Sequence, residues 1–216
     1  MRKGLRVTAG FIIGFDNEKP GAGDRIIQFV EKSGISLAMF SMLQVLPNTA
    51  LWTRLEKEER IVEGTANINQ TTLMNFIPTR PVEDIAKEYI QAFWELYDPL
   101  KYLERTYRQF MILGEPRNPS QLRRPNFATL RALFIICWRQ GIVRKTRWKF
   151  WVYLVSMIKN KNSHWQHYLS ICALGEHFLE YRELVRSQIQ SQLDEYLKLQ
   201  AAQAEEKQPA IAEKSA

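Results

Sequence analysis

Two short clusters of glycine and polar residues, each at the end of an apolar run, are where this sequence could bind a ligand. The first contains Gly10, Gly14 and the polar turn 16–18, and the second contains Gln44 and the turn 47–49. In proteins with parallel strands, ligands bind at the carboxyl ends of the strands. Glycines at such a place let a flat ligand lie against the backbone. Ordinary packing and turn formation is the alternative interpretation, and the dinucleotide-binding spacing G-x-G-x-x-G is absent.

A strand–helix–strand unit is predicted to position these clusters. Residues 5–15 are β-branched and aromatic without clean alternation, which is typical of a strand buried on both faces. Residues 20–33 have one apolar face and stop before Gly34, as a helix does, and residues 36–46 again predict a strand. Two strands joined by such a helix form a parallel pair, so their carboxyl ends should lie at the same edge.

The rest of the chain is predicted to be mostly helical, which gives an α/β plus α fold class. A short helix should follow the 47–49 turn, capped by Asn48 or Thr49. A polar loop is expected over 63–78, and Pro81 and Asp98-Pro99 mark the starts of two helices. Further helices are predicted over 126–140, ended by Gly141, over 146–160 and over 163–199.

The composition suggests four consecutive regions. The strand–helix–strand unit with its short helix takes residues 1–62, and the loop with a helical pair takes 63–115. A basic, aromatic-rich helical region follows over 116–200 and begins with a connector that contains three prolines. Residues 201–216 lack an apolar face and are expected to be a disordered tail.

The sequence shows no pattern of residues that is typical of a metal site or of a hydrolytic active site. The two cysteines, Cys137 and Cys172, are too few and too far apart for a disulfide framework or a metal knuckle. His164 and His167 share a helix face, but no carboxylate or third ligand lies nearby in the sequence. No Ser/His/Asp or Cys/His arrangement is present. No metal site is therefore predicted.

Positive charge is concentrated in one region. The chain has a formal net charge of +7, and residues 116–175 contain no Asp or Glu but eleven Lys and Arg residues, interleaved with aromatic residues. Basic residues beside aromatic ones describe a helix on an anionic membrane surface, which is one expected partner. A helical bundle with solvated Lys and Arg is the alternative, and nucleic acid is disfavoured. No secretory signal or membrane-spanning run is visible, so a cytoplasmic protein, peripheral to a membrane, is expected.

Several linked motifs of the first half occur in an order that resembles the last two β/α units of the radical S-adenosylmethionine (radical SAM) barrel. The resemblance is narrower to the cobalamin-binding radical SAM proteins, a subgroup that includes hopanoid C-2 methylases. It covers residues 4–115 well and extends loosely to about residue 200. The segments that carry it are Gly10-Phe-Ile-Ile-Gly-Phe-Asp16, Ser33-Gly-Ile35, Leu43-Gln44 with Leu46-Pro47 and Thr49, Asn75-Phe-Ile-Pro78, and Tyr97-Asp-Pro99 with Tyr102.

The resemblance implies a TIM-like barrel remnant, formed by the last two parallel strands, followed by a helical carboxyl-terminal domain. It also implies that the strand over Gly10 to Gly14 holds the adenosine part of S-adenosylmethionine. The segment from Gln44 to Thr49 would face the adenine or the substrate, with Asn48 where a glycine is common. The pocket residues expected on this basis are Gly10, Ile12, Gly14, Gln44 and Thr49.

The family's C-x-x-x-C-x-x-C iron–sulfur loop and a cobalamin-binding segment are absent from this sequence. A [4Fe–4S] cluster needs clustered thiolates, so the chain is expected to bind no cofactor and to be inactive alone. S-adenosylmethionine, [4Fe–4S] and cobalamin are implied for a complete parent. The chain is predicted to be a carboxyl-terminal fragment or split half, whose partner is a separate amino-terminal half with the cluster. A non-catalytic, membrane-associated helical module is the alternative.

Overall fold

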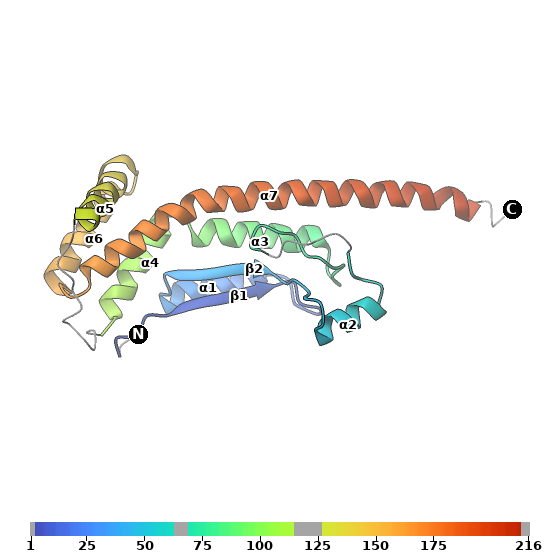
Figure 1. Ribbon diagram of the computed structural model, residues 1–216, viewed down its shortest axis with the longest axis horizontal. Helices are drawn as coiled ribbons and strands as arrows, with labels where there is room; N and C mark the ends of the chain where they lie inside the picture. The colour runs from blue at the N-terminus through green and yellow to red at the C-terminus, as the bar shows by residue number, and fades with distance from the viewer. Residues whose placement is uncertain (1–2, 63–68, 115–126, 213–216) are drawn as a thin grey trace. The chain divides into compact units, whose positions relative to one another are not determined.

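The computed structural model describes residues 3–62, 69–114 and 127–212 (Figure 1). The chain forms two compact units that alternate along the sequence. Unit 1 comprises Met1–Phe11, Asp24–Met39 and Ala92–Arg182, and unit 2 comprises Ile12–Gly23, Phe40–Gln91 and Glu183–Ala216. The division predicted from the sequence follows chain order instead, and its connector over 116–125 lies outside the described residues.

The predicted strand–helix–strand unit is present at the beginning of the chain. Strand β1 (Thr8–Ile13) is followed by helix α1 (Ala22–Ser33) and strand β2 (Leu37–Met42). The two strands pair in parallel as a two-stranded sheet, visible side by side in Figure 1. Both strands are shorter than predicted, and α1 ends directly before Gly34 as expected. The structure therefore confirms the fold class, a partial barrel followed by a mostly helical region.

The two strands bury alternate residues rather than all of them. Ala38, Phe40 and Met42 of β2 are fully or almost fully buried, whereas Met39 between them is 54% exposed. In β1, Ile13 is buried and Ile12 is 47% exposed. The expectation of a strand buried on both faces is therefore wrong for β1. The strands therefore leave the side chains of Ile12 and Met39 exposed.

Three helices follow the sheet in the order expected from their capping residues. Helix α2 (Ala50–Lys57) starts after Thr49, whose hydroxyl accepts a hydrogen bond from the amide of Trp52. Helix α3 (Val82–Leu96) begins one residue after Pro81, and helix α4 (Pro99–Ile112) begins with a proline. The carboxylate of Asp98 accepts the amide hydrogens of the first turn of α4, so it satisfies donors that the helix itself cannot.

A π-helix joins the next two helices, where the sequence predicts a break. Helix α5 (Phe127–Trp138) continues into the π-helix η2 (Arg139–Val143), and helix α6 (Arg147–Asn160) follows. Gly141 does not end a helix at residue 140, so that prediction is wrong. Its backbone is buried under Trp151, whose ring would lie 2.7 Å from an added Cβ, and the indole donates a hydrogen bond to the Gly141 carbonyl. The absence of a side chain at Gly141 lets the Trp151 ring approach the backbone closely.

Helix α7 (Trp165–Ala212) is longer than predicted. The sequence pattern placed its end near Leu199, whereas the helix continues through Ala212. The disordered tail over 201–216 stays a prediction. Residues 201–207 are Ala, Gln, Glu and Lys, which have high helix propensity, so a helix forms there without an apolar face. None of the helices in the described part of the chain combines the length and apolar character needed to cross a membrane.

Candidate functional site

The carboxyl ends of the two strands meet at one edge, as the parallel arrangement requires. The amide of Leu43, just after β2, donates to the carbonyl of Ile13 at the end of β1 over 2.7 Å. Gly14 follows with a φ of 95°, a conformation that residues with a Cβ rarely adopt. A Cβ on Gly14 would also lie 2.7 Å from the sulfur of Met74. The space beside Gly14 is thus filled by Met74.

The turn after β1 is closed by its own acidic residues. The amide of Gly14 donates to the carboxylate of Glu18 over 2.9 Å. The carboxylate of Asp16 accepts hydrogen bonds from Arg60, at 2.7 Å and 3.2 Å, and from the more exposed Arg54. The hydrogen bonds from Arg60 hold the pKa of Asp16 below its usual value, although partial burial opposes this. The first turn is therefore tied to the region around α2.

Replacement of Asp16 by asparagine is expected to lower the free energy of unfolding at neutral pH by about 2 kcal/mol, because charge-assisted hydrogen bonds to Arg60 are lost. A lowered folded-state pKa adds stability above the unfolded-state pKa, and this contribution disappears as pH falls through the folded value. The difference between wild type and Asp16→Asn should therefore shrink below about pH 4. Urea unfolding at several pH values measures it. Asp194→Asn, at an exposed position of α7, is the control, and a pH-independent difference would contradict the ion pair.

The segment after β2 is fixed by two amide side chains. Nε2 of Gln44 donates to the carbonyl oxygens of Thr72 and Leu73, at 3.3 Å and 2.9 Å. The side chain of Asn75, which is buried, pairs with both backbone groups of Val45 over 2.8 Å each, as a neighbouring strand would. Oε1 of Gln44 is buried and has no hydrogen-bond partner within the described residues. Segment 72–75 is therefore held against both strand ends.

The turn before α2 has a conformation that explains its residue types. Asn48 has a φ of 64°, a left-handed conformation that asparagine adopts more readily than most residues and that glycine adopts freely. Thr49 caps α2, and its hydroxyl also donates to the carbonyl of Leu46 over 2.7 Å. The side chain of Thr49 is thus occupied by turn and cap contacts, as the alternative interpretation of this segment states.

The structure brings some of the predicted pocket residues together. Gly14 and Gln44 both contact segment 72–75. Ile12 is exposed on β1, and nothing lies within 4 Å of a Cβ added to Gly10, so these two positions leave open space above the strand. The assignment of all five residues to a pocket stays a prediction.

Sequence reasoning missed the residues that fix this edge, Met74, Asn75 and Arg60. The segment Asn75-Phe-Ile-Pro78 gives no local sign of what Asn75 binds, because its partner Val45 is remote in the sequence. Arg60 is remote from Asp16 in the sequence, and nothing in the local pattern indicates that the two side chains pair.

The described cysteines and acidic residues do not form a metal site. No group of three or more His, Cys, Asp or Glu side chains that could hold a metal occurs within residues 3–62, 69–114 and 127–212. Burial raises the pKa of the Cys172 thiol to about 12 and also raises that of Cys137. Burial thus favours the thiol over the thiolate at both positions.

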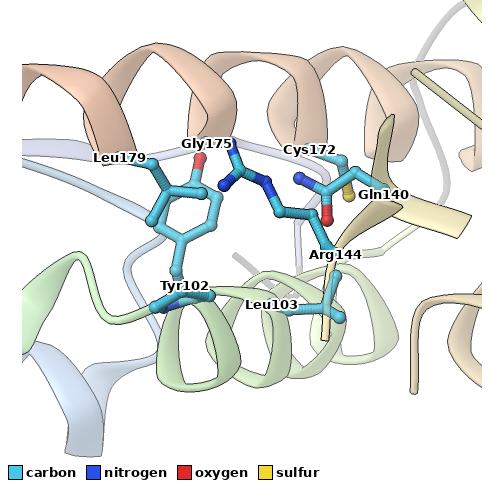
Figure 2. Close-up of a pocket in the computed structure, with 8 residues that line it drawn as sticks. Tyr102, Leu103, Gln140, Arg144, Cys172, Gly175 and Leu179 are labelled. Atoms are coloured by element: carbon cyan, nitrogen blue, oxygen red, sulfur yellow. The ribbon is translucent and has the colours of Figure 1, made fainter. Parts of the chain in front are cut away.

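A small cavity lies in unit 1, between α4, η2 and α7 (Figure 2). Its volume is about 10 Å³, which is enough for one water molecule. Its lining includes Tyr102, Gln140 and Cys172, and the Tyr102 hydroxyl already donates to the carbonyl of Ile171. The cavity is too small for an organic substrate.

The profile of a protein family described as a domain of unknown function, DUF4070, matches residues 49–191. The chain belongs to this family. Much of the DUF4070 region is helical, and it contains segment 72–75, whereas Gly10, Ile12, Gly14 and Gln44 precede it.

Two curated proteins are similar to this DUF4070 chain. A Synechocystis protein described as an uncharacterized methyltransferase is 55% identical over 201 residues, which are 93% of this chain and 38% of the relative. The hopanoid C-2 methylase of Rhodopseudomonas palustris is 27% identical over 183 residues, or 82% of this chain and 33% of that enzyme. The chain thus matches less than two fifths of the length of each of these relatives. No solved structure matches it significantly.

Proposed function

We propose that this chain is the carboxyl-terminal part of a radical SAM methyltransferase of the cobalamin-dependent type, acting on an unreactive carbon of a lipid-like substrate. The observation that carries this proposal is the parallel pair β1 and β2, with one uncovered side, in front of a DUF4070 domain. Two strands cannot close a barrel, and an uncovered side is what the last two strands of a larger barrel would have. The similarity to two proteins named as methyltransferases supports the reaction class.

The residues fit S-adenosylmethionine only in part. The open space at Gly10 and the exposed side chain of Ile12 suit a flat adenosine group, which could lie against the strand. Gly14 does not offer such space because Met74 occupies it. In the proposed parent, Gly10 and Ile12 would contact the ligand, whereas Gly14 and Gln44 would shape the edge through segment 72–75. S-adenosylmethionine would supply the radical and the methyl group.

The residues do not fit a [4Fe–4S] cluster. Cys137 and Cys172 are the only cysteines of the sequence, and two thiols are fewer than such a cluster requires. The cluster and cobalamin would therefore be held by another part of the parent, either in the same polypeptide or in a separate amino-terminal half. This chain would supply the end of the barrel and would not be catalytic alone.

The proposal is tested by assembling the chain with the part of the Synechocystis relative that lies outside the matched region. The two polypeptides are co-expressed, purified without oxygen, reconstituted with iron, sulfide and cobalamin, and assayed with a low-potential reductant. Retention of S-adenosylmethionine labelled in its methyl group, and transfer of label to a hopanoid-containing lipid extract, are then measured. Binding and transfer by the assembly, with neither by the chain alone, are expected.

Replacement of Gly10 by valine in this assembly is expected to weaken retention of S-adenosylmethionine at least about tenfold, because the branched side chain fills space that the ligand would use. Thr8→Val is the matched control, since it lies on the same strand and almost conserves volume. Equal retention of S-adenosylmethionine by both variants would mean that β1 is not part of the binding site. Failure of the two polypeptides to associate would contradict the split-enzyme form of the proposal.

A second candidate function is a non-catalytic role at an anionic membrane surface. It is favoured by the exposed aromatic residues of α5 and α6 and does not depend on the proposed chemistry.

A further inference from the structure

Helix α6 has two apolar faces, of which only one is covered. Phe150, Leu154 and Met157 recur at helical spacing and are buried. The opposite face should be polar if the helix lay at an ordinary protein surface. Instead it exposes a second apolar stripe at helical spacing, with Trp148 74% exposed. The members of this stripe are Trp148, Trp151, Val152, Val155 and Ile158.

Helix α5 exposes apolar residues in the same way. Among the side chains of α5 whose burial is described, Ile136 is buried, whereas Phe134 is 68% exposed and stacks on the exposed Trp138. The large exposed side chains recur at positions i, i+3, i+4, i+7, i+8 and i+11, so they lie along one side of the helix. That side consists of Phe127, Leu130, Arg131, Phe134, Ile135 and Trp138. The exposed side continues into η2, where Ile142 and Val143 are exposed. They follow Gly141, which Trp151 covers.

Some of the basic residues near this surface form ion pairs with carboxylates, and others do not. Arg144 pairs with Glu176, Arg139 with Glu180, and Lys149 with Glu104. Four basic residues are exposed and make no ion pair with another described residue, namely Arg131, Lys145, Arg147 and Lys159. Lys145 and Arg147 precede the exposed stripe of α6 and Lys159 follows it. The stripe therefore has cationic residues at both ends.

We propose that the exposed side of α5, η2 and α6, here called the aromatic–basic surface, binds an anionic lipid bilayer. Helices at a membrane interface bury one apolar face among the acyl chains and place Lys and Arg among anionic headgroups. Soluble monomers rarely expose large apolar patches without a partner. A second copy of this chain would bring like charges together, because residues 116–175 contain no acidic residue. A bilayer offers apolar volume and negative charge together.

Vesicle binding by the full 216-residue chain tests this proposal. The chain is mixed with vesicles of phosphatidylcholine, or of phosphatidylcholine with phosphatidylglycerol, and the bound fraction is measured by sedimentation. Binding to the anionic vesicles is expected, and salt should weaken it because it screens the headgroup charge. Brominated lipids should quench tryptophan fluorescence in wild type and quench it less in Trp148→Ala, because the indole would lie among the acyl chains.

Two sets of substitutions separate the electrostatic and apolar contributions. Lys145→Gln, Arg147→Gln and Lys159→Gln together should lower affinity roughly 100-fold, since each basic residue near an anionic surface contributes about fivefold. Trp148→Ser with Val152→Ser should lower it at least about tenfold. The matched controls lie on other helices. They are Lys57→Gln, Lys87→Gln and Lys198→Gln together for charge, and Leu174→Ser with Leu199→Ser for exposed apolar residues.

Several outcomes would overturn the proposal. Absence of vesicle binding, or equal affinity for neutral and anionic vesicles, would exclude an anionic bilayer as the partner. Equal loss in the control variants would mean that the effect is not specific to this surface. A dimer that Trp148→Ser dissociates, without vesicle binding, would make the surface an interface between copies. Circular dichroism and thermal unfolding confirm that each variant is folded, and none of these results depends on methyltransferase activity.

Discussion

Replacement of Asn75 by alanine is expected to lower the free energy of unfolding by about 3 kcal/mol, because two buried backbone groups lose their partners. The Asn75 side chain accepts from the Val45 amide and donates to the Val45 carbonyl, at 2.8 Å each. No neighbouring strand offers a substitute at this position within the described residues. Both groups of Val45 would then be buried without compensation, which costs more than the bonds themselves contribute. Urea unfolding measures the loss.

Two further variants make this prediction specific. Asn160→Ala removes an exposed asparagine with one hydrogen bond, to Ser156, and should change stability by less than about 0.5 kcal/mol. Asn75→Asp keeps the acceptor for the Val45 amide, but its carboxylate would face the Val45 carbonyl. Protonation restores a donor, so Asn75→Asp should gain stability relative to wild type as the pH falls. Similar losses for Asn75→Ala and Asn160→Ala would contradict the pairing.

The local pattern of residues was sufficient to predict most of the elements. Apolar periodicity, Gly34 and the caps at Thr49 and Asp98 determine α1, α2 and α4, since each signal acts within a few residues. The π-helix was not predictable in this way. A glycine at this position in a sequence ordinarily ends a helix. Gly141 instead lies inside η2, and the packing of Trp151, ten residues later, explains why. Burial of β1 was also mispredicted, because it depends on what covers the sheet.

The candidate site was predictable in position but not in its contacts. Parallel pairing places Gly14 and Gln44 at one edge, and this follows from the connection between the strands. Met74 and Asn75, which complete the edge, follow Gln44 by about thirty residues and belong to a segment without regular structure. Nothing in a single sequence fixes such a loop onto a strand end. For the same reason the sequence could not show that Met74 fills the space at Gly14.

A buried carboxylate, Glu176 of α7, holds the connection between α5 and α6. Its side chain is 6% exposed and accepts hydrogen bonds from Gln140 and Arg144. Gln140 lies in the π-helix η2, and Arg144 is the residue that follows it. Arg144 offers two nitrogens to the same carboxylate, and this pairing raises the pKa of its guanidinium. Glu176 therefore neutralises a charge and satisfies a buried amide at the same time.

Replacement of Glu176 by alanine is expected to lower the free energy of unfolding by about 3 kcal/mol, because it leaves Gln140 and the partly buried Arg144 without their acceptor. Glu180→Ala is the matched control on the same helix. Its carboxylate is 69% exposed and lies 3.7 Å from Arg139, so its loss should cost less than about 1 kcal/mol. Amide hydrogen exchange should accelerate over 139–144 in Glu176→Ala but not in Glu180→Ala, since only the first releases η2. Equal exchange in both variants would mean that packing of Trp151 on Gly141, rather than the carboxylate, holds the aromatic–basic surface together.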